Sequence, residues 1–157
     1  MLIGFSACSD DDGDDDKANY VKIGTTTHDL KGALCWWWES SHDGFYGFDI
    51  YFNEEDNFSD SYDGFSINAY TFYCNTPTPK SGTYTIIGDD VADMYHTGCL
   101  EHTNNYNTGY WDEGTMSSLS INDLGNGIYE FSISGKAEDG TTPIEMYYKG
   151  KVWFFED

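Results

Sequence analysis

The sequence predicts an all-β fold, and three observations lead to this prediction. Aromatic residues make up 18% of the 157 residues, and aromatic and β-branched residues favour strands over helices. Apolar residues recur with a period of two over much of the chain, whereas no segment keeps a helical period between a cap and a stop signal. Turn sequences such as Asp43-Gly44 and Gly125-Asn126-Gly127 separate the apolar runs at short intervals.

Each run of alternating residues is expected to be a half-buried strand, because successive side chains on a strand point to opposite faces. The strands are expected near residues 19–24, 29–38, 45–53, 65–74, 83–87, 115–121, 128–136 and 143–155. The segment Asp89–Glu113 between two of them is expected to be a long connection, and connections of that length are usually functional or disordered.

The parity of each run assigns the core. Its predicted members are Tyr46, Phe48, Ile50 and Phe52; Leu30, Leu34, Trp36 and Trp38; Tyr129, Phe131 and Ile133; and Ile144, Met146, Tyr148, Val152 and Phe154. This assignment turns Trp37, Tyr51, Tyr147, Trp153 and Phe155 toward the opposite face.

Two architectures suit these strands. The first is an antiparallel β-sandwich of about 8–9 strands, in which two sheets pack face to face. The alternative is a closed lipocalin-like barrel, which would hold a ligand inside rather than on a face or at loop tips. The strand pattern is compatible with both, because they differ in whether the sheet edges join.

The N-terminus resembles the end of a bacterial lipoprotein signal. The run Phe5-Ser6-Ala7-Cys8 follows an apolar stretch and places small residues before a single cysteine. The resemblance implies that Cys8 is the lipidation site and that residues 1–7 belong to a truncated signal peptide, whose positively charged region lies upstream.

Residues 8–17 form the lipidated cysteine and an acidic tether. Ser9 is followed by six aspartates among Asp10–Asp16, and such a run repels itself and stays solvated. A serine and an acidic run after the lipidated cysteine resemble the surface-export signal of Bacteroidota lipoproteins. We therefore expect an outer-membrane protein, lipid-anchored and exposed on the cell surface, with residues 18–157 as a single all-β domain.

Within that domain, a series of motifs resembles a recurrent β-domain of uncharacterised Bacteroidota surface lipoproteins. The motifs are Ser81-Gly82-Thr83-Tyr84-Thr85-Ile86, Gly114-Thr115-Met116-Ser117, Gly127-Ile128-Tyr129-Glu130-Phe131, Asp139-Gly140 and Tyr148-Lys149-Gly150. The resemblance implies an all-β surface lipoprotein, and it supplies no catalytic residue.

Charge excludes several classes of partner. The chain has 7 lysines and no arginine against 28 acidic residues, for a formal net charge of −21. A nucleic-acid binder needs a cationic patch to displace the counterions of phosphates, so nucleic acid is not an expected partner. The only expected contact with a membrane is the lipid anchor at the outer membrane.

No catalytic site or cofactor is predicted, because the sequence contains no nucleophile elbow, zinc-protease motif or phosphate-binding loop. His96, Cys99 and His102 are spaced like metal ligands but are interpreted as an accidental cluster. Calcium is the metal that the acidic surface would suit better, with carboxylates available at Asp89, Asp90, Asp93, Asp112 and Glu113. Cys74 and Cys99 are the preferred disulfide pair, whereas Cys35 is expected to be a buried thiol.

The outward aromatic residues suggest the function. Trp37, Tyr51, Trp111 and Trp153 are the candidate ligand-binding residues, because flat rings stack on the C–H faces of sugars. The first hypothesis is a non-catalytic accessory binder of extracellular glycan. The alternatives are a structural or adhesive surface protein that contacts other proteins, and a lipocalin-like binder of an apolar small molecule.

Overall fold

The computed structural model describes residues 17–40, 44–56, 58, 62–85, 94–106 and 110–156. The described residues form ten strands and no helix, which confirms the all-β prediction. In chain order the strands are β1 (Tyr20–Ile23), β2 (Thr26–Asp29), β3 (Gly32–Glu39), β4 (Tyr46–Asn53), β5 (Ser66–Cys74), β6 (Gly82–Thr85), β7 (Met94–Thr103), β8 (Asp112–Gly125), β9 (Ile128–Ala137) and β10 (Pro143–Glu156). The structure therefore has no helix that could cross a membrane within these residues.

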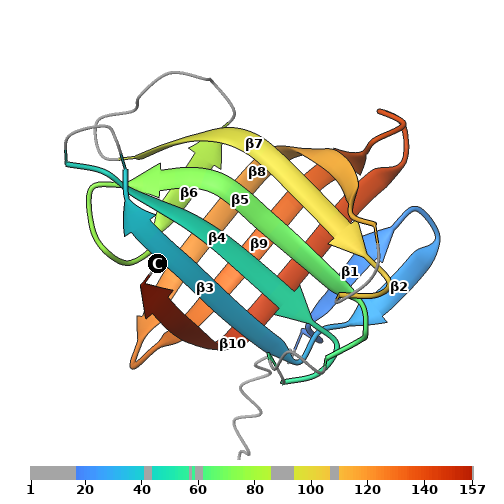
Figure 1. Cartoon of the computed structure of the whole chain (residues 1–157), viewed down its shortest axis with the longest axis horizontal. Helices are drawn as coiled ribbons and strands as arrows, with labels where there is room; N and C mark the ends of the chain where they lie inside the picture. Colours follow the sequence, from blue (N-terminus) through green and yellow to red (C-terminus); the bar gives the residue numbers. More distant parts are fainter. Residues whose placement is uncertain are drawn as a thin grey trace, which may run out of the picture.

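Seven of the strands close into a barrel. The strands β3, β4, β5, β7, β8, β9 and β10 pair in that order, and β10 pairs with β3 to complete the ring. The alternative closed barrel therefore fits the structure, and the predicted antiparallel sandwich fits only in part. Figure 1 shows the front wall of β3, β4, β5 and β7 lying across the back wall of β8, β9 and β10.

The odd number of strands decides how the barrel closes. The six pairings from β3 round to β10 are all antiparallel. Six reversals leave β10 running in the same direction as β3, so the closing pair is parallel, with Val152 opposite Ala33 and Glu156 opposite Trp37. A sandwich with two free pairs of edges would not need this pairing.

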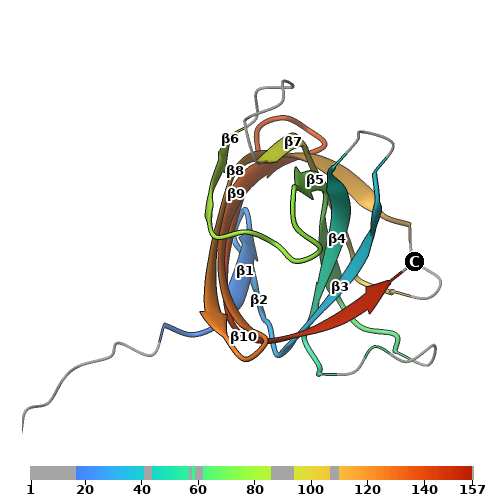
Figure 2. The same ribbon diagram turned by 90° about the vertical axis from the view of Figure 1, so that its left-hand side faces the viewer.

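Strand β10 is long enough to pair with two different strands in succession along one of its edges. Its first half pairs with β1, from Ile144 opposite Ile23 to Tyr147 opposite Tyr20, and its last residues pair with β3. Figure 2 shows β10 leaving the wall of β8 and β9 and crossing the base of the barrel toward β3. The β1–β2 hairpin lies at one end of the barrel, and β6 extends the sheet beside β8.

Aromatic side chains fill the interior. Phe52 contacts both Phe131 and Tyr148 with ring centroids 5.4 Å apart, and Phe48 stacks on Phe72 at 5.3 Å. All five side chains are at most 2% exposed. Rings of this size bury a large apolar area each, so the barrel is a packed core along these strands.

Turn chemistry matches the prediction at the two hairpins that follow β8 and β9. Asn126 and Gly127 both have positive φ, of 56° and 75°, as a two-residue hairpin turn requires. In the second hairpin the Asp139 carboxylate accepts hydrogen bonds from the backbone N–H of Thr141 and Thr142 and from the Thr142 hydroxyl. These bonds stabilise the ionised form and lower the pKa of Asp139 to about 2.

Two predictions about the strands need correction. Strand β7 occupies much of the segment that was expected to be a connection, because pairing with β5 and β8 outweighs a sequence with little alternation. In β3 the parity is inverted: Ala33 and Cys35 lie in the core, and Trp37 packs against it. The apolar run from Ala33 to Trp38 contains no polar residue that would fix the parity.

We predict that Phe131→Ala destabilises the protein by about 3–5 kcal/mol, through lost burial and the cavity it leaves. Phe131 is fully buried in β9, whereas the adjacent Ser132 is exposed. Ser132→Ala is the matched control and should change the free energy of unfolding by less than about 0.5 kcal/mol. Urea denaturation measures both, and a larger loss for Ser132→Ala would show that the two faces of β9 are exchanged.

Glu130, the other neighbour of Phe131, is unsuitable as that control. It accepts a hydrogen bond from the Tyr147 hydroxyl at 2.8 Å and another from the Asn122 amide at 3.3 Å. These two bonds lower the pKa of Glu130. Replacing Glu130 by alanine would therefore also remove two hydrogen bonds, and not only an exposed carboxylate.

Candidate functional site

The strand register places one residue from each of six neighbouring strands in a line across the outside of the barrel. We call this line the outer row: Trp153, Leu34, Tyr51, Asn68, Glu101 and Glu113. With neighbouring strands ~4.8 Å apart, the row extends over roughly 24 Å. It begins with apolar and aromatic side chains and ends with carboxylates.

The apolar end of the row carries exposed rings. Trp153 and Phe155 of β10 are 43% and 45% exposed, and Trp36 of β3 is 37% exposed. The rings of Trp36 and Phe155 lie 5.3 Å apart, consistent with their pairing in the parallel register. These three side chains surround the buried Leu34, and we call them the exposed platform.

An ammonium group already occupies one side of this platform. The Nζ atom of Lys151 lies 3.5 Å from the centroid of the Trp153 ring. A cation at this distance is attracted by the negative face of the indole. The platform therefore combines apolar surface with one indole face that already holds the positive charge of Lys151.

Trp37 is not part of the platform, which corrects the prediction for this residue. It pairs with the buried Phe48, and its ring meets the Tyr46 ring edge-on at 5.6 Å inside the barrel. Trp36, one residue earlier, takes the outward position instead. The reason is the register, since Trp36 lies opposite Phe155 and Asp49, both on outer-face positions.

Trp38 shares the outer face with Trp36 but is half-buried. Its ring lies over Gly47 of β4, where an added Cβ would clash with the indole. Trp38 also meets Tyr73 edge-on at 6.5 Å. It supports the wall of the barrel rather than offering a free face.

Tyr51 and Trp111, two of the predicted binding residues, come together in the middle of the outer row. Their ring centroids lie 6.1 Å apart, and Tyr106 contacts both at 6.1 and 5.9 Å. We call these three side chains the ring cluster. The backbone N–H of Tyr106 donates to the Gly64 carbonyl, which fastens the cluster to the start of β5.

The acidic end of the row shapes the local electrostatics. Burial raises the pKa of Tyr51, and the charges of Asp49 and Glu101 raise it further. Burial likewise raises the pKa of Tyr70 to about 12, with contributions from Cys99 and from the carboxylates of Glu101 and Glu113. Both phenols therefore stay neutral near pH 7 and act as hydrogen-bonding rings.

Tyr147, the remaining outward aromatic of β10, lies away from the outer row. It pairs with Tyr20 of β1 and is only 7% exposed. The Lys17 ammonium lies 4.0 Å from the centroid of its ring. The segment before β1 therefore covers this ring.

The predicted disulfide between Cys74 and Cys99 is wrong, because neither these two cysteines nor Cys35 form a disulfide in the structure. Cys74 lies opposite Met94 and Cys99 opposite Tyr70. The two cysteines are thus five residues apart along β7, roughly 16 Å at ~3.3 Å per residue. A disulfide requires Cα atoms within about 7 Å. Cys74 instead lies 2.8 Å from the Tyr84 hydroxyl, and burial raises its pKa.

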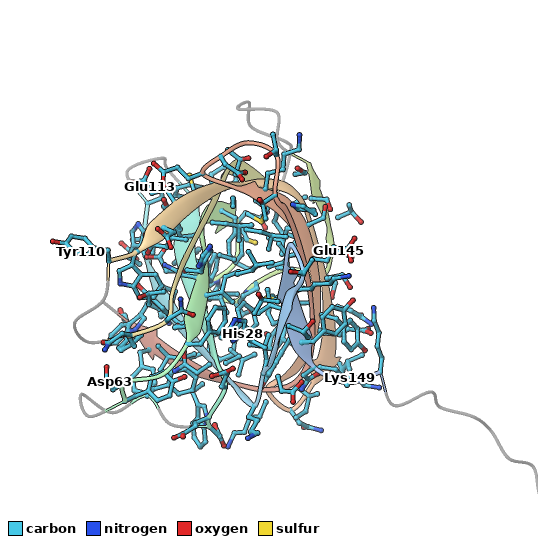
Figure 3. The ribbon with its side chains drawn as sticks, turned by 90° about the vertical axis from the view of Figure 1, so that its right-hand side faces the viewer. His28, Asp63, Tyr110, Glu113, Glu145 and Lys149 are labelled. Atoms are coloured by element: carbon cyan, nitrogen blue, oxygen red, sulfur yellow. The ribbon has the colours of Figure 1, made fainter. Side chains whose placement is uncertain are left out.

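A second feature is an open depression of about 180 Å³ beside the β1–β2 hairpin. His28 stacks on Phe65 at 3.7 Å and lies 2.8 Å from the Glu54 carboxylate, whereas Nδ1 of the half-buried His102 has no hydrogen-bond partner among the described residues. Burial lowers the pKa of His102 below its ordinary value. Figure 3 shows His28 near the centre of this end of the barrel.

His96, Cys99 and His102, which the sequence spaces like metal ligands, are not gathered into a ligand set in the part of the chain that the structure describes. Cys99 belongs to the outer face with Glu101, whereas His102 lies opposite the buried Ile67 and turns inward. Residues three apart on a strand point to opposite faces. The calcium candidates Asp89, Asp90 and Asp93 lie outside the described residues, and Asp112 and Glu113 are exposed at the start of β8.

Comparison with known proteins provides no further guide. The chain matches no protein-family model, no curated protein and no solved structure. The resemblance to Bacteroidota surface lipoproteins stays a prediction, and the function has to be argued from the outer face itself.

Sequence reasoning missed Trp36 and two polar members of the row, Asn68 and Glu101. The parity of β10 had placed Phe155 outward, but only the parallel pairing with β3 shows that Trp36 lies beside it. Asn68 and Glu101 carry no recognisable motif. They join the row because β5, β7 and β8 pair in register, and β7 was not among the expected strands.

We predict that Trp37→Ala and Trp36→Ala differ sharply in stability. Removing Trp37 opens a space against the core and should cost about 3 kcal/mol, near the low end for a buried tryptophan because its ring is only partly buried. Removing the exposed Trp36 should cost less than about 1 kcal/mol. Thermal and urea denaturation measure the stability of both variants. A larger loss for Trp36→Ala than for Trp37→Ala would show that Trp36 faces the core, as the sequence predicted.

Proposed function

We propose that this protein is a non-catalytic binder of extracellular glycan and that the outer face of the barrel is its binding surface. The observation that carries the proposal is the exposed platform of Trp36, Trp153 and Phe155, three large apolar side chains gathered on one face. Exposed apolar groups gathered in this way mark interaction sites, whereas singly scattered ones are normal.

The surface suits a sugar chain for two reasons. Flat rings offer broad contact to the C–H faces of sugar rings, and polar groups farther along the outer row supply hydrogen bonds to hydroxyl groups. The row is also long and follows the curved outside of the barrel, so it fits an extended chain. A ligand bound on the outer face stays open to solvent on one side. A long polymer can therefore extend beyond the binding surface at both ends.

The proposed binding residues are therefore Trp36, Trp153 and Phe155, with Tyr51 and Trp111 in the adjoining ring cluster. Trp37 is not among them, because its ring packs against the core. No residue is assigned a catalytic role.

The two alternatives receive different support. A surface protein that contacts other proteins would use the same exposed rings. Whether these rings bind a glycan or a protein therefore distinguishes this alternative from the proposed function. A binder of an apolar small molecule would need space inside the barrel, where the rings of Phe48, Phe52, Phe72, Phe131 and Tyr148 instead pack against one another. The outer face is therefore the better-supported surface.

The lipid anchor at Cys8 and display on the outer side of the outer membrane belong to the same proposal. They rest on the cysteine box and the acidic run, both of which lie outside the described residues. An anchored barrel with a binding surface on its side wall would hold a sugar chain near the cell.

A glycan array followed by calorimetry on residues 18–157 tests the proposed function. For a sugar that binds, we expect Trp36→Ala and Trp153→Ala each to weaken affinity about tenfold, which corresponds to ~1.4 kcal/mol of lost stacking. Leu124→Ala is the control, because Leu124 is also 45% exposed but lies at the far end of β8.

Binding that survives loss of both tryptophans would overturn the assignment of the surface. A protein that binds no glycan but retains a protein partner through these rings would support the adhesive alternative instead.

A further inference from the structure

Lysine is concentrated on one part of the barrel wall. The strands β1, β9 and β10 carry lysines and carboxylates in similar number, namely Lys22, Lys136, Lys149 and Lys151 against Glu130, Glu145 and Glu156. The other strands have no lysine in their sequences, and they carry carboxylates at Asp29, Glu39, Asp49, Glu101, Asp112, Glu113 and Asp123. In a chain with a formal net charge of −21, β10 therefore belongs to the wall that repels an anionic ligand least.

The outer face of β10 places two of these lysines in line with the exposed platform. Lys149, Lys151, Trp153 and Phe155 alternate along the strand, and all four side chains are exposed. Alternate residues of a strand share one face. We call these four residues the β10 stripe. Because Trp36 of β3 lies beside Phe155, the stripe joins the lysines directly to the rings that are proposed to bind sugar.

Lys151 holds its charge at the surface of the Trp153 ring. Its Nζ atom lies 3.5 Å from the ring centroid, and the residue opposite it on β9 is the apolar Ile128. Lys151 forms no ion pair with a carboxylate among the residues that the structure describes. An ammonium group has three hydrogen-bond donors, and a ring face is not a hydrogen-bond acceptor for all of them. A sugar that stacks on Trp153 therefore lies next to a positive charge that no carboxylate neutralises.

Lys149 adds a second charge in a well-fixed part of the strand. Asn19 brackets its backbone, since Asn19 Nδ2 donates to the Lys149 carbonyl at 3.1 Å and the Lys149 N–H donates to Asn19 Oδ1 at 2.7 Å. On β9 it lies opposite Glu130, which accepts hydrogen bonds from Tyr147 and Asn122. The charge of Lys149 is thus partly balanced, and Lys151 is the principal cation beside the platform.

The carboxylates of the outer row lie too far away to cancel this charge. Four strand spacings of ~4.8 Å separate Glu101 from Trp153 along the row, which is about 19 Å. The Debye length at physiological salt is about 8 Å, so these carboxylates are screened from Lys151. Figure 3 shows Glu113 on the opposite side of the barrel from Lys149. An anionic group is therefore attracted at the β10 end of the row and repelled at the other end.

We propose that the glycan carries an acidic sugar, which stacks on Trp153 and places its anionic group on Lys151. This inference rests on the proposed function and adds the chemical class of the sugar and its place on the barrel. Uncharged sugars of the same chain continue along the row toward the ring cluster. A lysine acts as a point charge, so it pairs with a carboxylate or a sulfate alike, and the negative charge is the recognised feature.

Nuclear magnetic resonance titration of the isotope-labelled whole chain tests the inference with two pairs of trisaccharides. The first pair is α-1,4-linked galacturonic acid and its full methyl ester, which have the same rings and linkages and differ in charge. The second pair is sulfated maltotriose and maltotriose itself, which tests a sulfate in place of a carboxylate. In at least one pair we expect the charged sugar to bind about fivefold more tightly at low salt, as for an exposed ion pair, and to shift the indole N–H signal of Trp153. The preference should disappear at about 0.5 M salt.

Single lysine variants locate the effect. Lys151→Met removes the charge and keeps a long apolar side chain beside Trp153, so it should abolish the preference and leave the affinity for the uncharged sugars within about twofold. Lys136→Met is the matched control, because Lys136 is also exposed but lies opposite Pro143, eight residues from Lys151 along β10, or roughly 26 Å. Should Lys151→Met not fold, Lys151→Gln replaces it.

The outcomes separate the two proposals. Equal affinity within both pairs, or a preference that Lys151→Met retains or Lys136→Met also loses, overturns the inference and leaves the proposed glycan function standing. Binding to none of these sugars nor to any arrayed glycan overturns the proposed function itself. If only a polyaspartate peptide binds, and Lys151→Met abolishes that binding, the β10 stripe recognises an acidic protein segment and the glycan assignment is wrong.

Discussion

The parallel pairing between β3 and the last residues of β10 is the constraint on which the rest of the structure depends. A ring of seven strands linked by six antiparallel pairings can close only with a parallel pair. That pair sets Trp153 opposite Leu34 and Phe155 opposite Trp36. The same register turns Cys35 and Trp37 toward the core. The pairing that closes the barrel therefore also determines which side chains lie on the outer face.

The inside and the outside of this barrel have different roles. Inside, large rings pack face to edge along the strands and stabilise the closed sheet. Outside, exposed rings lie on the closing strands β3 and β10, and carboxylates lie farther along the outer row on β7 and β8. A barrel with a packed interior and a patterned wall is suited to bind an extended ligand along that wall, which is why the proposals concern its outer face.

Much of the fold could be predicted from the sequence, and the failures have physical reasons. Alternation located β4, β9 and β10, with Phe48, Phe131 and Tyr148 correctly in the core, because polar neighbours such as Glu130 and Lys149 fix their parity. The apolar run through Trp36, Trp37 and Trp38 has no such neighbour. Of the candidate site, Tyr51, Trp111 and Trp153 were found, whereas Trp36 and Glu101 depend on pairings between distant segments, which a single sequence does not reveal.

Nuclear Overhauser contacts across the closing strands test the central claim most directly. On isotope-labelled protein, we expect backbone contacts between Trp153 and Leu34 and between Phe155 and Trp36, advancing in the same direction along both strands. The aromatic protons of Trp36 and Phe155 should also contact each other. Contacts between the rings of Phe154 and Trp36, which the described register turns to opposite faces of the sheet, would show a register displaced by one residue, and contacts between Glu156 and Ala33 would show an antiparallel closure. Either result would contradict the proposed outer face.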